Sequence, residues 1–172
     1  MKIYFDTEFT DVHDSDFKLI SAGFVAENGR EFYFESPSNY QLEECSDFAV
    51  NQVIPNLGKL LSTNNLADHL PIKKSPVMDE YEASLKFRYF LLSFKEPVEL
   101  CCDAPNYDWP ALTKFLAKSK QPLAENLITK PKNVMSKRVY DKTNDYFETH
   151  PDAIMHHALC DARALAAALI SR

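Results

Sequence analysis

The chain has 172 residues and a formal net charge of −6, with 45% hydrophobic and 26% charged residues, an ordinary composition for a soluble globular domain. This length predicts a single domain over residues 1–172, large enough to bury a core without disulfide or metal staples. No apolar run approaches the ~20 residues that span a bilayer, and Asp6 comes too early for a signal peptide, so we expect a cytoplasmic protein without a membrane partner.

The first third of the chain predicts three strands. Lys2–Asp6, Leu19–Ala26 and Arg30–Ser36 are apolar runs rich in strand-forming residues. Asn28-Gly29 between the last two is a strong hairpin signal. We therefore expect an antiparallel, three-stranded start.

The middle of the chain contains one clear helix. Glu43–Lys59 is ambiguous and is interrupted at Pro55, and Ser62–Pro76 is polar and indicates a loop. Asp79–Phe94 has acids in its first turn and an apolar stripe at helical spacing, which predicts a helix packed against the core.

The last third alternates between strand and helix. Pro97–Cys102 predicts a short strand, Trp109–Ser119 a helix, and His156–Ser171 a closing helix rich in alanine and leucine. Gln121–Pro151 is polar, basic and irregular, apart from a short strand near Val134–Tyr140. Strands first, followed by alternating strands and helices, indicate an α/β fold with a mixed sheet flanked by helices.

Two acids end the first apolar run, in Asp6-Thr7-Glu8. Side chains two apart on a strand point to the same face, so Asp6 and Glu8 place two carboxylates side by side. Such carboxylates repel each other unless a cation lies between them, and oxygen ligands suit Mg²⁺ or Mn²⁺. Taken alone, the segment is better explained as a solvated acidic turn, because short acidic patterns recur by chance.

Two further acids lie near the second predicted helix. Asp108 immediately precedes Trp109–Ser119, with a proline in the first turn, and an N-cap role is a sufficient explanation for it. Asp103 ends the preceding strand and is either another acid of a site or a surface turn residue. The two roles of Asp108, cap and functional acid, do not exclude each other.

The last helix contains an acid and two histidines near its start. Asp161 lies where the helix dipole favours a negative charge, which is again a sufficient structural reason. His157 and Asp161 are four positions apart and would share a helix face, whereas His156 would not. Local geometry therefore prefers His157 as the partner of Asp161.

Three motifs recur in the order and spacing of a known family. Asp6-Thr7-Glu8 matches Asp-x-Glu after a strand, Tyr107-Asp108-Trp109-Pro110-Ala111-Leu112 matches Tyr-Asp-x-Pro-x-Leu, and residues 156–162 match His-x-Ala-Leu-x-Asp-Ala. Together they bracket nearly the whole chain. This combination resembles the histidine branch (DEDDh) of the DnaQ-like 3′–5′ exonuclease superfamily, and the small size and the Phe5–Phe9 opening look most like a group of short bacterial and phage exoribonucleases.

The resemblance implies an RNase H-like fold with a mixed five-stranded sheet, and a hydrolase that uses two divalent ions, Mg²⁺ or Mn²⁺. The implied metal ligands are Asp6, Glu8, Asp108 and Asp161. The resemblance assigns the general base to His156, against the local preference for His157, because the base has to lie on a loop or first turn where it meets the attacking water. Relatives often have Asn where this chain has Asp103, a departure that could weaken substrate binding or alter metal preference.

The expected substrate is single-stranded or 3′-overhang nucleic acid, with RNA preferred over DNA. A DNA 3′–5′ exonuclease of the proofreading or repair type is the alternative, and the intact acid set argues against a catalytically silent nucleic-acid-binding domain. Residues 114–142 contain eight basic and two acidic side chains and carry +6, which leaves −12 on the rest of the chain. This basic segment, Lys114–Lys142, is either a phosphate-contacting surface or a solvated face. A homodimer is compatible with the sequence.

Overall fold

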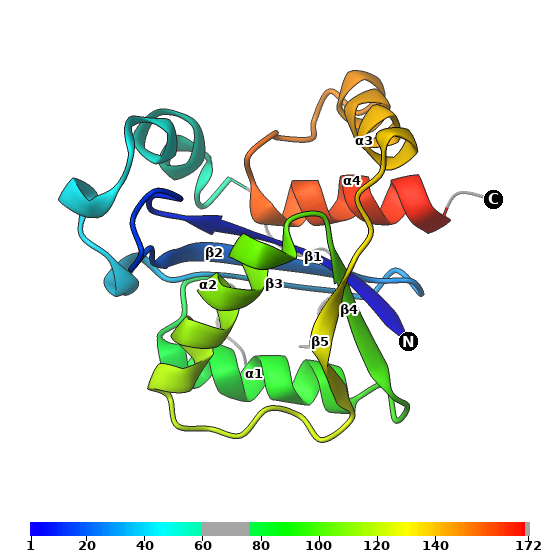
Figure 1. The fold of residues 1–172 in the computed structure, drawn as a ribbon, viewed down its shortest axis with the longest axis horizontal. Coiled ribbons are helices and arrows are strands. Elements are labelled where there is room, and N and C mark those ends of the chain that lie inside the picture. The colour runs from blue at the N-terminus through cyan, green and yellow to red at the C-terminus, as the bar shows by residue number, and fades with distance from the viewer. Residues whose placement is uncertain (60–75, 171–172) are drawn as a thin grey trace.

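The computed structural model describes residues 1–59 and 76–170, which form a five-stranded mixed sheet with helices on both faces (Figure 1). The strands are β1 (Lys2–Phe9), β2 (Leu19–Ala26), β3 (Glu31–Glu35), β4 (Val98–Cys102) and β5 (Leu127–Asn133). They lie in the order β3-β2-β1-β4-β5, with β1 to β3 antiparallel and with β4 and β5 parallel to β1. This order confirms the predicted α/β fold with an RNase H-like mixed sheet of five strands.

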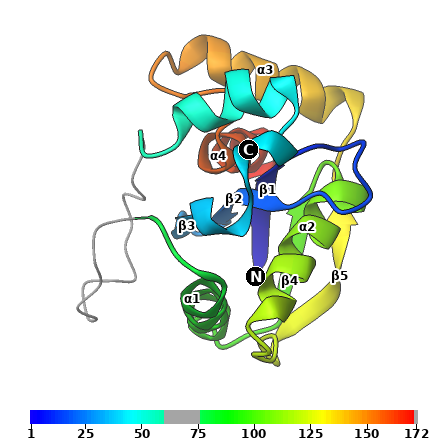
Figure 2. The ribbon, with the colours of Figure 1, turned by 90° about the vertical axis from the view of Figure 1, so that its left-hand side faces the viewer.

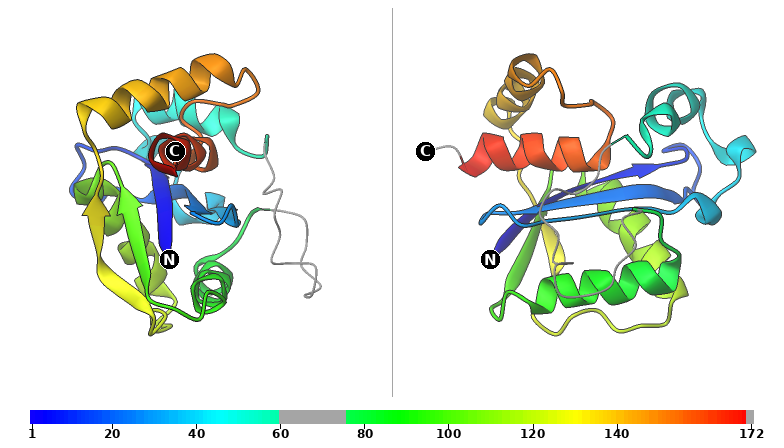
Figure 3. Two further views of the ribbon diagram at one scale, coloured as in Figure 1. Left: turned by 90° about the vertical axis from the view of Figure 1, so that its right-hand side faces the viewer. Right: turned by 180° about the vertical axis from the view of Figure 1, so that it is seen from behind.

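Helices cover the sheet from two sides. They are α1 (Glu80–Leu92), α2 (Pro105–Lys118), α3 (Lys137–Thr149) and α4 (Ala158–Ile170). The helices α1 and α2 lie on one face, and α4 lies on the opposite face with α3 packed against it (Figures 2 and 3). No helix within the two described ranges is long and apolar enough to cross a membrane.

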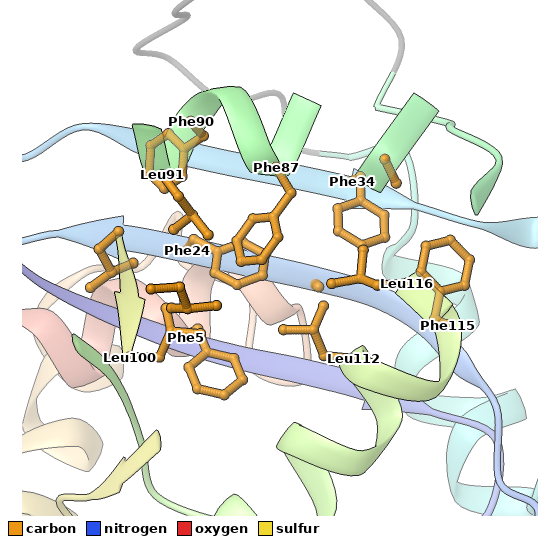
Figure 4. Close-up of a cluster of buried hydrophobic side chains, with 14 of the residues drawn as sticks. Phe5, Phe24, Phe34, Phe87, Phe90, Leu91, Leu100, Leu112, Phe115 and Leu116 are labelled. Carbon is orange, nitrogen blue, oxygen red and sulfur yellow. The ribbon is translucent and has the colours of Figure 1, made fainter. Parts of the chain in front are cut away.

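Each face of the sheet has its own hydrophobic core. Between the sheet and the pair α1 and α2, aromatic rings of both layers interlock, as in the 4.6 Å separation of the ring centroids of Phe24 and Phe87 (Figure 4). On the other face, α4 presents small side chains such as Ala158 and Ala162 to Tyr4 and to the rest of the sheet. Because alanine occupies little space, the axis of α4 can lie close to the strands.

Gly23 allows the closest approach of α4 to the sheet. This residue of β2 pairs with Asp6 of β1 in the antiparallel ladder. A Cβ atom at position 23 would lie 2.5 Å from backbone atoms of Ala158 and Leu159, so only glycine fits there. The first turn of α4 therefore lies directly on β2, next to the strand position that holds Asp6.

The N-terminal prediction is close to the structure. The bounds of Leu19–Ala26 are as predicted, and the expected hairpin leads from it to β3, with Gly29 at φ +84° and its N–H donating to Ala26 O at 2.8 Å. β1 is longer than the predicted Lys2–Asp6, because its pairing with β2 continues through Glu8 and Ser21. Asp6 and Glu8 thus both lie on the strand.

The prediction of an irregular segment over residues 121–151 is wrong in its first half, which contains the edge strand β5. Only Leu127 of this strand is fully buried, so its sequence shows no alternation of apolar and polar residues. Pro131 also interrupts the strand pattern and is tolerated because β5 has a neighbour on one side only.

The second half of the same segment forms α3, where a short strand near Val134–Tyr140 was expected. This helix packs on α4 rather than on the sheet, and Val139 is its only fully buried residue. The helical spacing of Val139, Tyr146 and Phe147 does mark one apolar face, so the sequence carries a signal for this helix, although polar and charged residues make up most of the segment.

Other boundaries also differ from the prediction. The helix expected over Trp109–Ser119 begins a turn earlier, and the closing helix begins two residues after His156. Glu43–Lys59 contains short helical turns, one of which includes Pro55. The predicted loop Ser62–Pro76 lies outside the described residues up to position 75.

Candidate active site

Five carboxylates meet at the edge of the sheet where the parallel strands β1 and β4 end. Asp6 and Glu8 lie on β1, Asp103 directly follows β4, Asp108 lies in the first turn of α2, and Asp161 lies in the first turn of α4. The carboxyl ends of parallel strands share one edge, and the helices that follow them begin there. The chain topology thus brings together acids that are far apart in sequence.

The five carboxylates form two trios that share one residue. Oxygen atoms of Asp6, Glu8 and Asp161 all lie within 4.8 Å of one another, and the same limit holds for Asp6, Asp103 and Asp108. The structure therefore brings together all four acids of the sequence motifs. It also adds Asp103, whose role the sequence left open.

Asp108 is held in place by β1 rather than by its own helix. The side-chain hydroxyl of Thr7 donates to Asp108 Oδ1 at 2.8 Å, and the Thr7 backbone N–H donates to the same oxygen at 3.3 Å. Because α2 begins at Pro105 and has Ala104 as its N-cap, the prediction of Asp108 as an N-cap is wrong. Its second oxygen, Oδ2, is buried and has no hydrogen-bond partner in the described part of the chain.

Asp161 is fixed through the backbone at the start of α4. The His157 N–H donates to Asp161 Oδ2 at 2.9 Å, and the His157 carbonyl accepts from the Asp161 N–H at 3.1 Å. The two residues are thus partners, as helix geometry suggested, but the imidazole takes no part. That ring is 2% exposed and packs on Tyr33 with a centroid distance of 4.7 Å.

His156 has a different environment from its neighbour. Its backbone is left-handed, with φ +60°, and it lies on the loop just before α4. Its ring is partly exposed and meets the ring of Phe48 edge-on, with the two ring centroids 4.8 Å apart. Asn56 Nδ2 donates to Met155 O at 3.3 Å and so holds the same loop in place. The short helical turns that precede position 60 therefore support the histidine loop.

The histidines also differ in basicity. Burial lowers the pKa of His157 to about 4, so its ring is neutral over the whole physiological range. Burial also lowers the pKa of His156, which keeps that ring neutral near pH 7 and able to accept a proton.

The pKa values of the carboxylates are shifted upward, whereas those of the two histidines are lowered. Burial, followed by repulsion from the neighbouring carboxylates, raises the pKa values of Asp6 and Glu8 well above their ordinary range. Burial is also the main cause that raises the pKa values of Asp108 and Asp161 to about 7. No Lys, Arg or His within residues 1–59 and 76–170 forms an ion pair with any of these acids.

The donor set fits a hard divalent cation. All donors of the cluster are carboxylate oxygens, the ligands that Mg²⁺ and Mn²⁺ prefer, and no thiol or imidazole belongs to either trio. A cation would relieve the mutual repulsion and give the buried Asp108 Oδ2 a partner. The residues present therefore fit the metal ions that the sequence motifs imply.

The basic segment is divided between two environments. In α2, Lys114 donates to Ser15 O at 3.0 Å, and the ammonium group of Lys118 contacts Asn39 and Glu80. Four other basic residues are exposed and form no ion pair with any described residue: Lys130, Lys132, Lys137 and Arg138. They lie on β5 and at the start of α3, and Lys132 pairs in register with Cys101, two residues before Asp103.

Sequence reasoning missed three residues that shape the site. Thr7 shares a strand face with Phe5, opposite to Asp6, and strand alternation could have placed it toward α2. Gly23 and Phe48 gave no such signal, because their roles depend on contacts with residues more than 100 positions away.

A comparison with models of known protein families and a search of curated proteins both found no match to this chain.

Proposed function

We propose that this protein is a metal-dependent 3′–5′ exoribonuclease of the DEDDh type, which hydrolyses phosphodiester bonds from the 3′ end. The main observation in favour is the convergence of Asp6, Glu8, Asp108 and Asp161. Three separate sequence motifs supply these acids, and a partly exposed histidine directly precedes the helix of the last one.

The carboxylates would hold two divalent ions, Mg²⁺ or Mn²⁺. Bound there, the ions would lower the pKa of a coordinated water and stabilise charge on the attacking and leaving oxygens. The protein supplies a rigid set of ligands: Asp6 and Glu8 lie on a paired strand, Thr7 orients Asp108, and the backbone of His157 orients Asp161.

His156 is the proposed general base. A base has to be unprotonated and accessible to water, and His156 is partly exposed with a lowered pKa. The buried ring of His157 meets the first condition but not the second. Structural surroundings therefore favour the same histidine as the motif does.

Substrate binding is assigned to the exposed bases on β5 and α3. The carboxylate cluster repels a polyanion, so a nucleic acid strand needs positive groups beside it. Lys132 lies on β5, which pairs with β4, and Asp103 directly follows β4. Lys132 is therefore near the acids along the sheet, but it belongs to neither trio.

Digestion of matched oligonucleotides tests the proposal. RNA and DNA strands of one sequence, labelled at the 5′ or the 3′ end, are incubated with Mg²⁺, Mn²⁺ or EDTA. We expect 5′-labelled RNA to yield a ladder that shortens by one nucleotide at a time, 3′-labelled RNA to release its label at once, and EDTA to stop both.

The matched variants are Asp6→Ala, which removes the shared ligand, and Asp141→Ala, which removes an exposed acid on α3. Cleavage by Asp6→Ala at the wild-type rate would refute the proposal, and so would internal cuts or release from the 5′ end. Faster degradation of DNA than of RNA would replace the exoribonuclease by a DNA 3′–5′ exonuclease.

A further inference from the structure

We propose that Asp103 is a fifth metal ligand, which lets the protein bind its second divalent ion without nucleic acid. This inference rests on the proposed two-metal function and goes beyond it, because the motifs imply four carboxylates only. Its starting point is the composition of the second trio, Asp6, Asp103 and Asp108, whose oxygen atoms lie within 4.8 Å of one another.

Without Asp103, the two ion positions would be unequal. The first trio offers three carboxylates, from Asp6, Glu8 and Asp161, while the second position would have only Asp6 and Asp108. Protein sites for Mg²⁺ commonly have one or two carboxylates and depend on substrate phosphates for the remainder. A third carboxylate makes the second position equal to the first in charge and in number of protein ligands.

The backbone holds Asp103 in a defined place. Its predecessor, Cys102, is the last residue of β4 and accepts a hydrogen bond from the Val134 N–H at 3.0 Å. Its successor, Ala104, caps α2 and accepts from the Asp108 N–H at 3.0 Å. Asp103 therefore lies between a paired strand and a helix start, and hydrogen bonds to the residues on both sides hold its backbone beside Asp108.

A second observation indicates that this trio faces a ligand. Asp108 is only 2% exposed, and Thr7 satisfies one of its two oxygens. The other oxygen, Oδ2, is buried and has no hydrogen-bond partner among residues 1–59 and 76–170, whereas buried carboxylate oxygens normally have one. No described cation pairs with Asp6, Asp103 or Asp108, and a divalent ion between these carboxylates would supply the missing positive charge.

Calorimetric titration of the metal-free protein with Mn²⁺, in the absence of nucleic acid, tests the inference. Asp103→Asn keeps the size of the side chain and removes its charge, Asp161→Asn does the same in the first trio, and Asp141→Asn removes an exposed charge on α3. We expect two Mn²⁺ per wild-type chain. Asp103→Asn should retain one site unchanged and weaken the other roughly tenfold or more, a loss at least as large as that of an outer partner of a metal site.

The controls separate this inference from the proposed function. Asp161→Asn should weaken the other Mn²⁺ site, and Asp141→Asn should leave both as in the wild type. Two unchanged sites in Asp103→Asn, or a single site in the wild type, would overturn the role of Asp103 and leave a four-carboxylate nuclease standing. A wild-type protein that binds no Mn²⁺ would overturn the inference and the proposed function together.

Discussion

At the scale of single residues, His156 and His157 are neighbours with opposite surroundings. The first is partly exposed on a loop, and the second is 2% exposed under Tyr33. Substitution of His156 should therefore affect the chemical reaction, and substitution of His157 should affect the stability of the fold.

We predict that His156→Ala lowers kcat by roughly 10²–10⁴, the usual range for a lost general base, with little change in melting temperature. His157→Ala should instead lower the melting temperature, because it leaves a cavity beside Tyr33, and should change kcat much less. Steady-state kinetics and thermal unfolding of both variants decide this. A larger loss of kcat in His157→Ala would transfer the role of base to that residue.

The acids predict a dependence of stability on pH. Asp108 and Asp161 have pKa values of about 7 in the folded protein, against an ordinary value of 3.8. The folded state thus holds protons that the unfolded state loses, so these groups contribute stability below about pH 4 that is lost as the pH rises to about 7.

Divalent ions should reverse this loss, because they bind the ionised carboxylates. We predict that Mn²⁺ raises the melting temperature of the wild type more at pH 7.5 than at pH 5, measured against EDTA controls. In Asp6→Ala, which lacks the shared ligand, the gain should be much smaller at both values. An equal gain for wild type and Asp6→Ala would mean that Mn²⁺ acts elsewhere.

At the scale of elements, the site depends on how closely α4 approaches the sheet. Gly23 permits this approach, since a Cβ there would meet the backbone of Ala158 and Leu159 at 2.5 Å. We predict that Gly23→Ala displaces the start of α4, lowers the melting temperature and weakens Mn²⁺ binding through Asp161.

Gly29→Ala is the matched control for that variant. No described atom lies within 4 Å of a Cβ at position 29, but its φ is +84°, so alanine costs about 1–2 kcal/mol of backbone strain without touching α4. Calorimetry should show normal Mn²⁺ binding in Gly29→Ala and weakened binding in Gly23→Ala. Normal Mn²⁺ binding in both variants would show that Gly23 does not control the geometry of the site.

The edge strand β5 offers a second test at this scale. We predict that Lys130→Glu combined with Lys132→Glu raises KM more than it lowers kcat. Each lost phosphate contact should also flatten the dependence of log affinity on log salt by about 0.7 for a single strand. Binding of labelled RNA to Asp6→Ala protein at several salt concentrations measures this slope.

The control for β5 uses bases at the opposite end of the sheet. Lys2 starts β1, and Lys95 precedes β4, so both lie away from the edge that holds the acids. Reversal of these two charges changes the net charge by the same amount and should leave the salt slope unchanged. If both double variants gave the wild-type slope, the basic segment would be a solvated face.

At the scale of the whole molecule, sequence patterns predicted the parts of the fold that have strong local signals. The bounds of β2 agree with the prediction to the residue because this mostly apolar, fully buried run lies between the charged residues Lys18 and Glu27. The helix α2 starts earlier than predicted, because Pro105 is the proline of its first turn and Pro110 lies inside the helix. The strand β5 buries no face large enough to leave an apolar pattern, whereas α3 has a helical pattern in Val139, Tyr146 and Phe147 that its largely polar composition obscures.

The site was predictable to a smaller extent. Local reasoning gave each acid an ordinary explanation, such as a turn or a cap, and only the combination of motifs suggested a common site. The convergence of Asp6 with Asp161, and the presence of Asp103 beside them, depend on strand order and on helix placement. No local pattern encodes these, because they arise when distant segments pack together.

The first trio of carboxylates, formed by Asp6, Glu8 and Asp161, also bears on the synthesis of the protein. Asp6 and Asp161 contribute to one cluster of oxygens although 155 positions separate them in the chain. A growing polypeptide contains Asp6 well before Asp161, and it cannot complete that cluster until Ala158–Ile170 has left the ribosome and packed on β2. For the proposed exoribonuclease, the order of synthesis itself delays any attack on RNA, including the messenger that is still being translated.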